Sequence, residues 1–373
     1  MTGSSISIFL AMLLLTPMWF ASAADDPGYA PIQHVEVGQP LGVSATQGDT
    51  WSFAWAGNGE IYSPANDGKG FGTERRNIAF NRISGNDPKA LTGQVTVDMA
   101  EYGPAGGTGA DHCSWKSSGC VAVDGVLYLV VARHLYGEVS GDVYKRQPAQ
   151  NSSIIKSADG GKTWTRTEKE NYDKPMFPGN SFATPYFVNY GQDGREVQVD
   201  GGDRYVYAMS NDGFWDNGDT MILGRVPRAK IGELDADDWQ FWSGGNGSQD
   251  KNWVTKPGQA RPVISEKGKL ASTGPVYLPV QKCYFLVAWY YPMGGGKMPN
   301  ACTETRWDFY TARHPWGPWT QVGEHTFSPE AYYCPQVCPK FTSADGKTLY
   351  VVAAGDWHKP ACYRLTLVPL RIQ

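Results

Sequence analysis

The chain has 373 residues, a formal net charge of -4 and only 19% charged residues. This weak negative charge gives no reason to expect nucleic acid or an anionic membrane as a partner. The 44 Gly, 25 Pro and 13% aromatic residues favour many short strands joined by turns over helices. We therefore predict an all-β protein.

The first 23 residues have the features of an export signal. An apolar run extends from Ile6 to Phe20, and Ala21-Ser22-Ala23 supplies a small-residue cleavage pattern. The alternative, a membrane anchor, is disfavoured because the run is shorter than the ~20 residues that a span needs. We expect a mature chain that begins near Ala24, is secreted or periplasmic, and forms a single domain over residues 24–373.

The chain contains seven cysteines, which is compatible with disulfides in an exported protein. Close spacings favour three pairs: Cys113 with Cys120, Cys283 with Cys302, and Cys334 with Cys338 or Cys362. Zinc is the alternative, but no two cysteines form a CxxC pair. We expect at least one disulfide, and no metal or cofactor.

The clearest structural unit lies between His112 and Trp164. Two apolar segments, 115–123 and 126–132, flank Asp124-Gly125, which is a strong signal for a two-residue β-hairpin turn. A third strand is predicted at Ser153–Ser157, and the residues from Ser157 to Trp164 fit the S-x-D-x-G-x-T-W pattern of an Asp-box turn. The unit is therefore an antiparallel meander.

The same order of elements recurs along the chain. The other predicted strands are 50–56, 60–65 and 76–82; 184–190, 204–210 and 221–226; 274–280, 283–289 and 307–312; and 336–341, 348–354 and 363–368. Five meanders predict a five-bladed β-propeller. The segment around His34–Val37 is expected to add the outer strand of the last blade.

In a propeller, residues just before the first strand and just after the second strand of each blade converge on one face. A ligand is expected there. The predicted substrate-binding residues are Arg76, Trp115, Lys116, Tyr136, Asn211, Asp212, Trp215, Trp289, Tyr333 and Asp356. Aromatic rings beside hydrogen-bonding Asp and Asn side chains are typical of a sugar-binding cleft.

Two pairs of residues on this face are candidates for catalysis. Asp49 and Asp67 lie at the two ends of the first hairpin, and paired carboxylates are what glycoside hydrolysis requires. The alternative for each is capping of a turn. His112 and His134 hold the same relative positions in the second hairpin, near Lys116 and Arg133. A histidine base with a nearby cation suits β-elimination of a uronate, although both could merely bind sugar hydroxyls or backbone.

Several motifs resemble those of a known family. Asp49-x5-Trp55 with Asn66-Asp67-Gly68, together with the Asp-box strand from Ile154 to Trp164, is similar to a five-bladed propeller family, long a domain of unknown function, that includes endo-D-arabinanases. The resemblance implies that Asp49 and Asp67 are the catalytic pair. The sequence Asn66-Asp67-Gly68 departs from the Gly-Asp-Thr of that family. The histidine pair is similar instead to propeller ulvan lyases and rhamnose–glucuronate lyases.

These observations lead to one functional hypothesis and two alternatives. The hypothesis is a monomeric enzyme that hydrolyses glycosidic bonds in a polysaccharide or oligosaccharide, with Asp49 and Asp67 as the carboxylate pair. The first alternative is a polysaccharide lyase that uses His112 and His134. The second is a propeller that binds glycans without catalysis.

Overall fold

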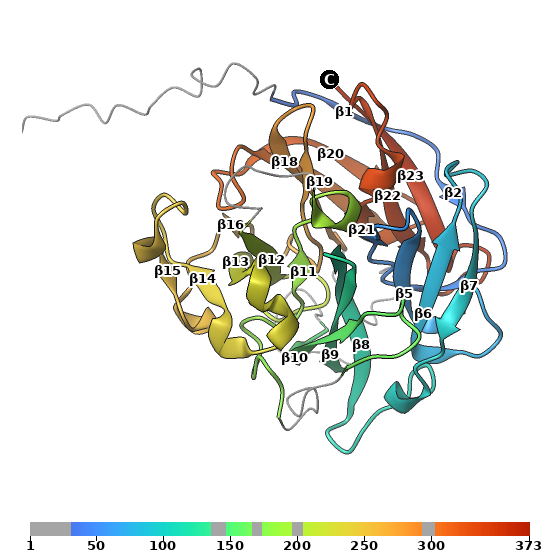
Figure 1. Cartoon of the computed structure of the whole chain (residues 1–373). Helices are drawn as coiled ribbons and strands as arrows, with labels where there is room; N and C mark the ends of the chain where they lie inside the picture. Colours follow the sequence, from blue (N-terminus) through green and yellow to red (C-terminus); the bar gives the residue numbers. More distant parts are fainter. Residues whose placement is uncertain (1–30, 136–146, 166–173, 196–203, 293–302) are drawn as a thin grey trace, which may run out of the picture.

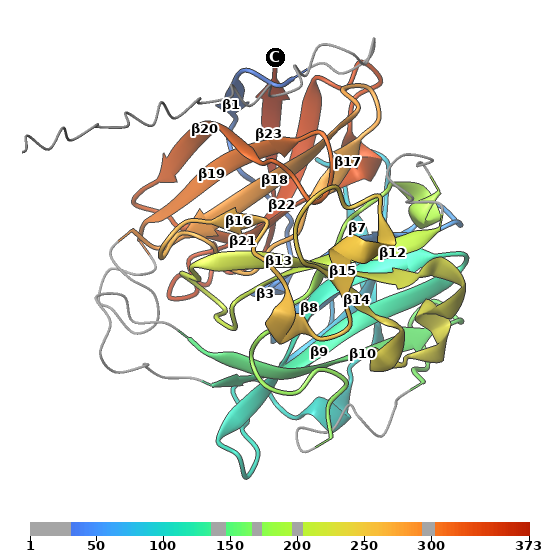
Figure 2. The ribbon, with the colours of Figure 1, turned by 90° about the vertical axis from the view of Figure 1, so that its left-hand side faces the viewer.

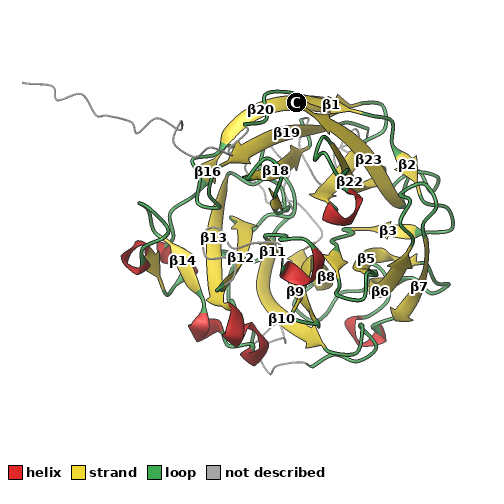
Figure 3. Cartoon of the chain, turned by 45° about the horizontal axis from the view of Figure 1, so that its top comes forward, coloured by secondary structure: helices red, strands yellow, loops and turns green. Residues whose placement is uncertain are grey.

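The computed structural model describes residues 31–135, 147–165, 174–195, 204–292 and 303–373. Five antiparallel sheets stand around a common centre (Figure 1; Figure 3), which confirms the predicted five-bladed β-propeller. The predicted signal peptide lies outside the described residues. Within them, no helix is both long enough and apolar enough to cross a membrane.

The first two blades come from the strands on which the sequence prediction was clearest. Blade 1 contains β3 (Gln47–Asp49), β4 (Ala54–Trp55), β5 (Ile61–Gly70), β6 (Arg76–Ser84) and β7 (Thr92–Val97). Blade 2 contains β8 (Cys113–Val123), β9 (Val126–Leu135) and β10 (Ala149–Ser157). Asp124 and Gly125 both have positive φ, at 51° and 82°, as a type I′ hairpin turn requires. The predicted hairpin is confirmed by the pairing of Val123 with Val126.

The remaining blades follow the same plan. Blade 3 contains β11 (Tyr186–Phe187), β12 (Tyr205–Asn211), β13 (Thr220–Pro227), β14 (Gln240–Trp242), β15 (Trp253–Val254) and β16 (Ile264–Ser265). Blade 4 contains β17 (Val276–Leu278), β18 (Cys283–Tyr290), β19 (Thr305–Ala312) and β20 (Thr320–Phe327). Blade 5 contains β21 (Tyr332–Val337), β22 (Thr348–Gly355), β23 (Leu365–Ile372), β2 (Leu41–Gly42) and β1 (Val35–Val37).

Short 3-10 helices occupy the connections between strands. They are η1 (Ala100–Tyr102), η3 (Gln192–Gly194), η4 (Arg228–Glu233), η5 (Ala236–Asp238), η6 (Asp250–Asn252), η7 (Pro257–Gln259) and η8 (Pro339–Phe341). Several project at the outer rim of blade 3, well away from the centre of the ring (Figure 3).

The N-terminal part of the described chain closes the ring. Strand β1 pairs antiparallel with the C-terminal strand β23, with Val35 opposite Ile372, and the two lie side by side in Figure 2. The prediction that the segment around His34–Val37 supplies the outer strand of blade 5 is therefore confirmed. Val35 also lies against Gly323 of β20, so β1 links blade 5 to blade 4.

Hydrogen bonds between neighbouring inner strands fix the centre of the propeller. The Ser118 hydroxyl of blade 2 donates to the Pro185 carbonyl of blade 3 at 3.0 Å. The Thr273 hydroxyl of blade 4 donates to the Pro335 carbonyl of blade 5 at 2.7 Å. The backbone N–H of Phe53 in blade 1 donates to Gln336 of blade 5 at 2.9 Å. These buried contacts satisfy polar groups that the narrow centre hides from water, and they hold the blade ends in register.

The predicted disulfides are not formed in the described part of the chain. Cys113, Cys120, Cys334, Cys338 and Cys362 are all free. Cys113 and Cys120 lie seven residues apart on the single strand β8, which at ~3.3 Å per residue separates them far beyond bonding distance. Cys334 lies in β21 and Cys338 follows its end, and both thiols are free. Cys283 is buried and also free, and its predicted partner Cys302 lies outside the described residues.

The turn predicted at Ser157–Trp164 is held together by its aspartate. Asp159 accepts hydrogen bonds from the Lys162 and Thr163 N–H groups and from the Thr163 and Ser157 hydroxyls. These donors lower the pKa of Asp159 to about 2, with the Thr163 hydroxyl first among the causes. Trp164 packs edge-on against Phe80 at 4.8 Å, so this turn joins blade 2 to blade 1.

Candidate active site

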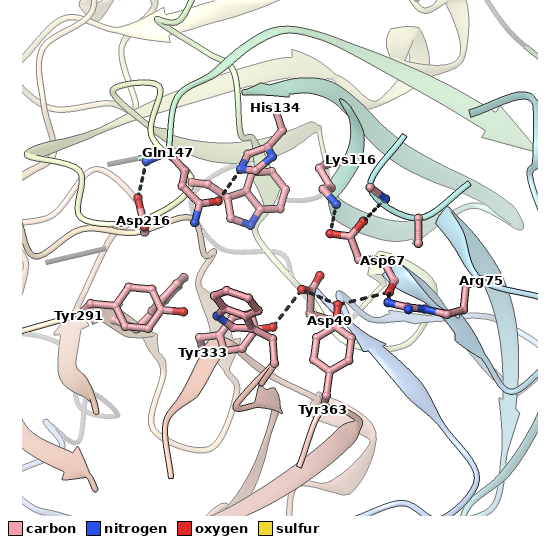
Figure 4. A pocket seen from close by; sticks show the side chains of 15 residues that line it. Asp49, Asp67, Arg75, Lys116, His134, Gln147, Asp216, Tyr291, Tyr333 and Tyr363 are labelled. Carbon is pink, nitrogen blue, oxygen red and sulfur yellow. Dashed lines mark hydrogen bonds and ion pairs between the residues drawn. The ribbon is translucent and has the colours of Figure 1, made fainter. Parts of the chain in front are cut away.

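A cavity of about 460 Å³ opens where all five blades contribute residues (Figure 4). Its lining combines three carboxylates and three cationic or imidazole side chains with six aromatic rings. The residues are Asp49, Asp67, Arg75, Ala105, Gly106, Lys116, His134, Gln147, Trp215, Asp216, Trp289, Tyr291, Tyr333, Trp357 and Tyr363. The volume falls within the usual range for a small-molecule or substrate pocket.

Asp49 lies at the floor of the cavity, at the end of β3. The pairing of β3 with β5 is interrupted by a bulge between Gln47 and Asp49, and Asp49 lies opposite Asn66. Its Oδ2 atom accepts hydrogen bonds from the Tyr333 hydroxyl at 2.9 Å and the Tyr363 hydroxyl at 3.0 Å. The Thr50 hydroxyl donates to Oδ1 at 3.1 Å. Both carboxyl oxygens are therefore fixed by hydroxyl groups.

The surroundings of Asp49 favour its protonated form. Burial of the carboxyl group raises its pKa to about 6, and the neighbouring Asp67 adds to this effect. Lys116 and the two tyrosine hydroxyls act in the opposite direction but do not outweigh burial. A carboxyl group with a raised pKa can donate a proton near neutral pH, as a general acid must.

Asp67 lies in β5 and is held beside Lys116. The two side chains form an ion pair, and the lysine is 97% buried, with an exposed fraction of only 3%. The N–H of Gly106 donates to Asp67 Oδ1 at 3.2 Å. Arg75 donates to the Asp67 backbone carbonyl at 3.2 Å, which brings a second cation to this side of the cavity. A cationic side chain and a backbone N–H therefore contact the Asp67 carboxylate directly.

A second polar group lies apart from the carboxylate pair in Figure 4. The Nε2 atom of His134 lies 2.7 Å from the side-chain oxygen of Gln147. The backbone N–H of Gln147 donates to Asp216 Oδ1 at 2.8 Å. Burial lowers the pKa of His134 to about 3, and the charge of Lys116 contributes further. His134 is therefore a neutral imidazole across the physiological pH range.

Aromatic rings form part of the cavity wall. Trp289 contacts Tyr291 edge-on at 5.3 Å, and Tyr333 lies 5.8 Å from Trp289. Asn217 donates to the Tyr291 carbonyl at 2.9 Å and accepts from its N–H at 3.1 Å, which ties blade 3 to blade 4 next to Asp216. The wall is consequently held in place from two blades.

Seven of the predicted site residues line this single cavity. They are Asp49, Asp67, Lys116, His134, Trp215, Trp289 and Tyr333. They come from every blade. The rule used in the sequence analysis, that residues before the first and after the second strand of each blade converge on one face, is called here the hairpin-end rule. It located the cavity without any knowledge of the sheet register. Tyr136 lies outside the described residues.

His112, Trp115 and Arg76 do not line the cavity. His112 precedes β8 in an exposed turn with φ of 60°, so it does not join His134 in the cavity as predicted. Ser114 is the residue opposite His134 in the sheet. Trp115 is the neighbour of Lys116 in β8, so its side chain lies on the opposite face of the sheet. There the Arg133 guanidinium lies 4.3 Å from the centre of the Trp115 ring. Arg76 forms an ion pair with Asp98 at 2.9 Å.

Three further predicted residues stabilise loops at the cavity margin instead of lining it. Asn211 is buried and donates to the carbonyls of Phe214 and Leu270. Asp212 accepts the Asp219 N–H at 3.0 Å. Asp356 is also buried and accepts the His358 N–H at 2.9 Å. In each case a short polar side chain satisfies backbone groups of nearby loops.

Arg75, Gln147, Asp216 and Tyr363 line the cavity but were not predicted. Arg75 is adjacent to the predicted Arg76, and Asp216 is adjacent to the predicted Trp215. Gln147 and Tyr363 come from segments that precede the third strands β10 and β23. The hairpin-end rule considered only first and second strands, so nothing in it could have indicated these two residues. In the described part of the chain, no cluster of three or more His, Cys, Asp or Glu residues could hold a metal ion.

Comparisons with solved structures find similar folds at low identity. A candidate hydrolase from Bacteroides ovatus aligns with a TM-score of 0.53 and 11% identity over 93% of this chain and 92% of that chain. A xylan β-1,4-xylosidase from Bacillus halodurans C-125 aligns with a TM-score of 0.47 and 12% identity, covering 89% of this chain and 56% of that chain. An exo-β-1,3-galactanase from Phanerochaete chrysosporium gives 0.47 and 12%, with 91% and 64% covered.

Sequence comparisons give one family assignment. No curated protein sequence matches significantly. A family profile matches residues 38–368, which is most of the chain and includes all five blades. The chain therefore belongs to the DUF4185 family, which is described as a domain of unknown function.

Proposed function

We propose that this protein is a glycoside hydrolase that cleaves a polysaccharide, with Asp49 and Asp67 as its catalytic carboxylates. The observation that carries the proposal is the difference between the two environments. Desolvation raises the pKa of Asp49 to about 6, whereas Asp67 is paired with Lys116. Glycoside hydrolysis needs one neutral and one ionised carboxyl group across the scissile bond.

The roles of the two residues follow from these environments. Asp49 protonates the leaving oxygen, because it is the carboxyl group that keeps its proton nearer to neutral pH. Asp67 is the ionised partner that attacks the sugar or activates water. Tyr333 and Tyr363 donate to Asp49 and hold its carboxyl group in one orientation. The structural likeness to the Bacteroides ovatus candidate hydrolase supports the same reaction class.

The substrate class rests on the remaining lining and on the sequence. Aromatic rings beside amide and carboxylate groups suit sugar rings and their hydroxyls. The resemblance to a family with endo-D-arabinanases makes arabinan the first substrate to test. The predicted export signal supports a polymer outside the cytoplasm.

Elimination is the second candidate, because His134 is a neutral base inside the cavity. Two observations disfavour it. His112 lies in an exposed turn outside the cavity. Lys116, the cation that would neutralise a uronate carboxylate, is already paired with Asp67.

The first test is an activity screen with matched variants. The protein is incubated with arabinan, xylan, β-1,3-galactan, ulvan and polygalacturonate, and both new reducing ends and ultraviolet absorbance are recorded. We expect reducing ends without absorbance from at least one glycan. Asp49→Asn and Asp67→Asn should each lower kcat by about 10²–10⁴-fold, because each removes a proton-transfer or nucleophilic group used in the transition state.

The control for this screen is Asp98→Asn, which changes a partly exposed carboxylate that pairs with Arg76 outside the cavity. It should retain wild-type kcat. An absorbing product would support the lyase instead, because β-elimination leaves a carbon–carbon double bond. Glycan binding without any cleavage would support a non-catalytic propeller.

A further inference from the structure

Trp357 is unusual among the tryptophans of this protein. It is 41% exposed, more than any other tryptophan in the described residues, yet it lines the cavity. Scattered exposed apolar side chains need no explanation, but an exposed indole at the mouth of a cavity marks a surface that a ligand can cover.

The loop between β22 and β23 is anchored by residues on both sides of Trp357. Its neighbour Asp356 is only 2% exposed and forms an ion pair with Lys359 at 3.5 Å. Lys359 also donates to the Pro329 carbonyl at 3.3 Å, which fastens the loop to the preceding connection. The His358 N–H donates to Asp356. An aromatic ring that is fixed before binding loses little conformational entropy when a ligand covers it.

The Trp357 indole contacts one neighbouring ring and remains accessible to a ligand. The His358 ring lies against Trp357, with ring centres 3.6 Å apart. The other cavity aromatics are occupied differently: Trp289 is 1% exposed and packs against Tyr291, and the Tyr333 hydroxyl is bonded to Asp49. Trp357 is therefore the aromatic group of the described lining that is most accessible from solvent.

The same short loop reaches the catalytic floor. Tyr363, six residues after Trp357, donates to Asp49 Oδ2 at 3.0 Å. An oligosaccharide that extends across the cavity from Asp49 would consequently contact Trp357 at the rim of the cavity. The C–H groups on one face of a sugar ring pack well on an indole, which offers a large, rigid and amphipathic surface.

We propose that Trp357 forms a separate sugar-binding subsite at the rim, which takes a sugar ring of the substrate other than the one held at Asp49 and Asp67. The subsite rests on the proposed function for its ligand class, and it makes this protein selective for oligosaccharides and polysaccharides over small glycosides. Asp356 acts as the positioning residue of this subsite, because it anchors the loop without touching the ligand.

The test measures binding without catalysis. The Asp67→Asn variant is run in native gels that contain arabinan, xylan, β-1,3-galactan, ulvan or polygalacturonate, and the concentration dependence of its retardation gives Kd for each glycan. Added to this background, Trp357→Ala should weaken the Kd of the retained glycan by about tenfold, equivalent to ~1.4 kcal/mol. Trp357→Phe, which keeps a ring, should recover part of that loss.

Val280→Ala is the matched control, since Val280 is 52% exposed and lies outside the cavity. Its Kd should equal that of the parent. Thermal unfolding of each variant checks that folding is unaffected, and gel filtration checks that Trp357 is not covered by a second copy of the chain. An unchanged Kd for Trp357→Ala, a change in oligomeric state, or no retardation by any glycan would each overturn the subsite.

The outcomes for the subsite and for the proposed function are distinguishable. If the wild type cleaves a glycan but Trp357→Ala leaves its Kd unchanged, the subsite fails and the hydrolase stands. If Trp357→Ala weakens binding but the wild type cleaves nothing, the subsite stands and the hydrolase fails.

Discussion

Thr50 has a backbone conformation that β-branched residues rarely adopt. Its φ is 52°, in the left-handed region, and it follows Asp49 directly. Asp67 has a similar φ of 50°. Such conformations cost on the order of 1–3 kcal/mol each and persist where the surroundings impose them, which is often at functional sites. Here they accompany a hydroxyl that donates to Asp49 and a carboxylate beside Lys116.

The pKa of Asp49 predicts how activity depends on pH. If protonated Asp49 is the general acid, kcat/KM falls as pH rises through its pKa of about 6. The hydrogen bond from Tyr363 stabilises the ionised form and so lowers this pKa. Tyr363→Phe removes that bond, and the alkaline limb of the kcat/KM profile should move to higher pH.

The control for this experiment is Tyr350→Phe in β22, a residue outside the cavity whose change should leave the profile in place. A limb that stays where it is in Tyr363→Phe, or moves to lower pH, would show that Asp49 is not the acid that controls the reaction.

At the scale of elements, strand β1 has more influence than its three residues indicate. Val35 is buried, faces the largest core cluster, and contacts Gly323 of the neighbouring blade. Without β1 the outer edge of β23 would present unpaired N–H and C=O groups, which is unfavourable and promotes aggregation. Closure of the ring therefore depends on this short segment.

A charge at Val35 tests this role. Val35→Asp should lower the free energy of unfolding by roughly 3 kcal/mol, because it places an unpaired carboxylate in an apolar interface. Unfolding in denaturant, followed by tryptophan fluorescence, measures the change. Glu36→Lys, at the adjacent exposed position, should alter stability by no more than ~0.5 kcal/mol. Equal stability of the two variants would mean that β1 does not close the ring.

For the whole molecule, the architecture could be predicted because its signals are local. Each meander has its own turn and its own apolar strands, as the Asp124-Gly125 hairpin shows. Long-range features were harder to predict. The proposed Cys113–Cys120 bridge failed because both residues belong to one extended strand, and strand boundaries decide that geometry.

The accuracy of the predicted site residues was limited by the strand register, which the sequence does not reveal. Side chains alternate between faces along a strand, so an error of one residue moves a prediction from the cavity to the far side. This accounts for Trp115 beside Lys116 and for Arg76 in place of Arg75. The loop before β23 gave a different error, since Asp356 satisfies its own turn while Trp357 faces the cavity.

The central claim, hydrolysis by the Asp49 and Asp67 pair, is tested most directly by the origin of the oxygen in the product. The wild-type protein is incubated with the glycan found in the screen, in water labelled with heavy oxygen, and the fragments are weighed by mass spectrometry. Hydrolysis should add one labelled oxygen for each bond cleaved, with no labelled product from Asp67→Asn. Elimination would add no labelled oxygen at cleavage, and the fragment with the new non-reducing end would be lighter by one water than its hydrolytic counterpart. That result would contradict this account.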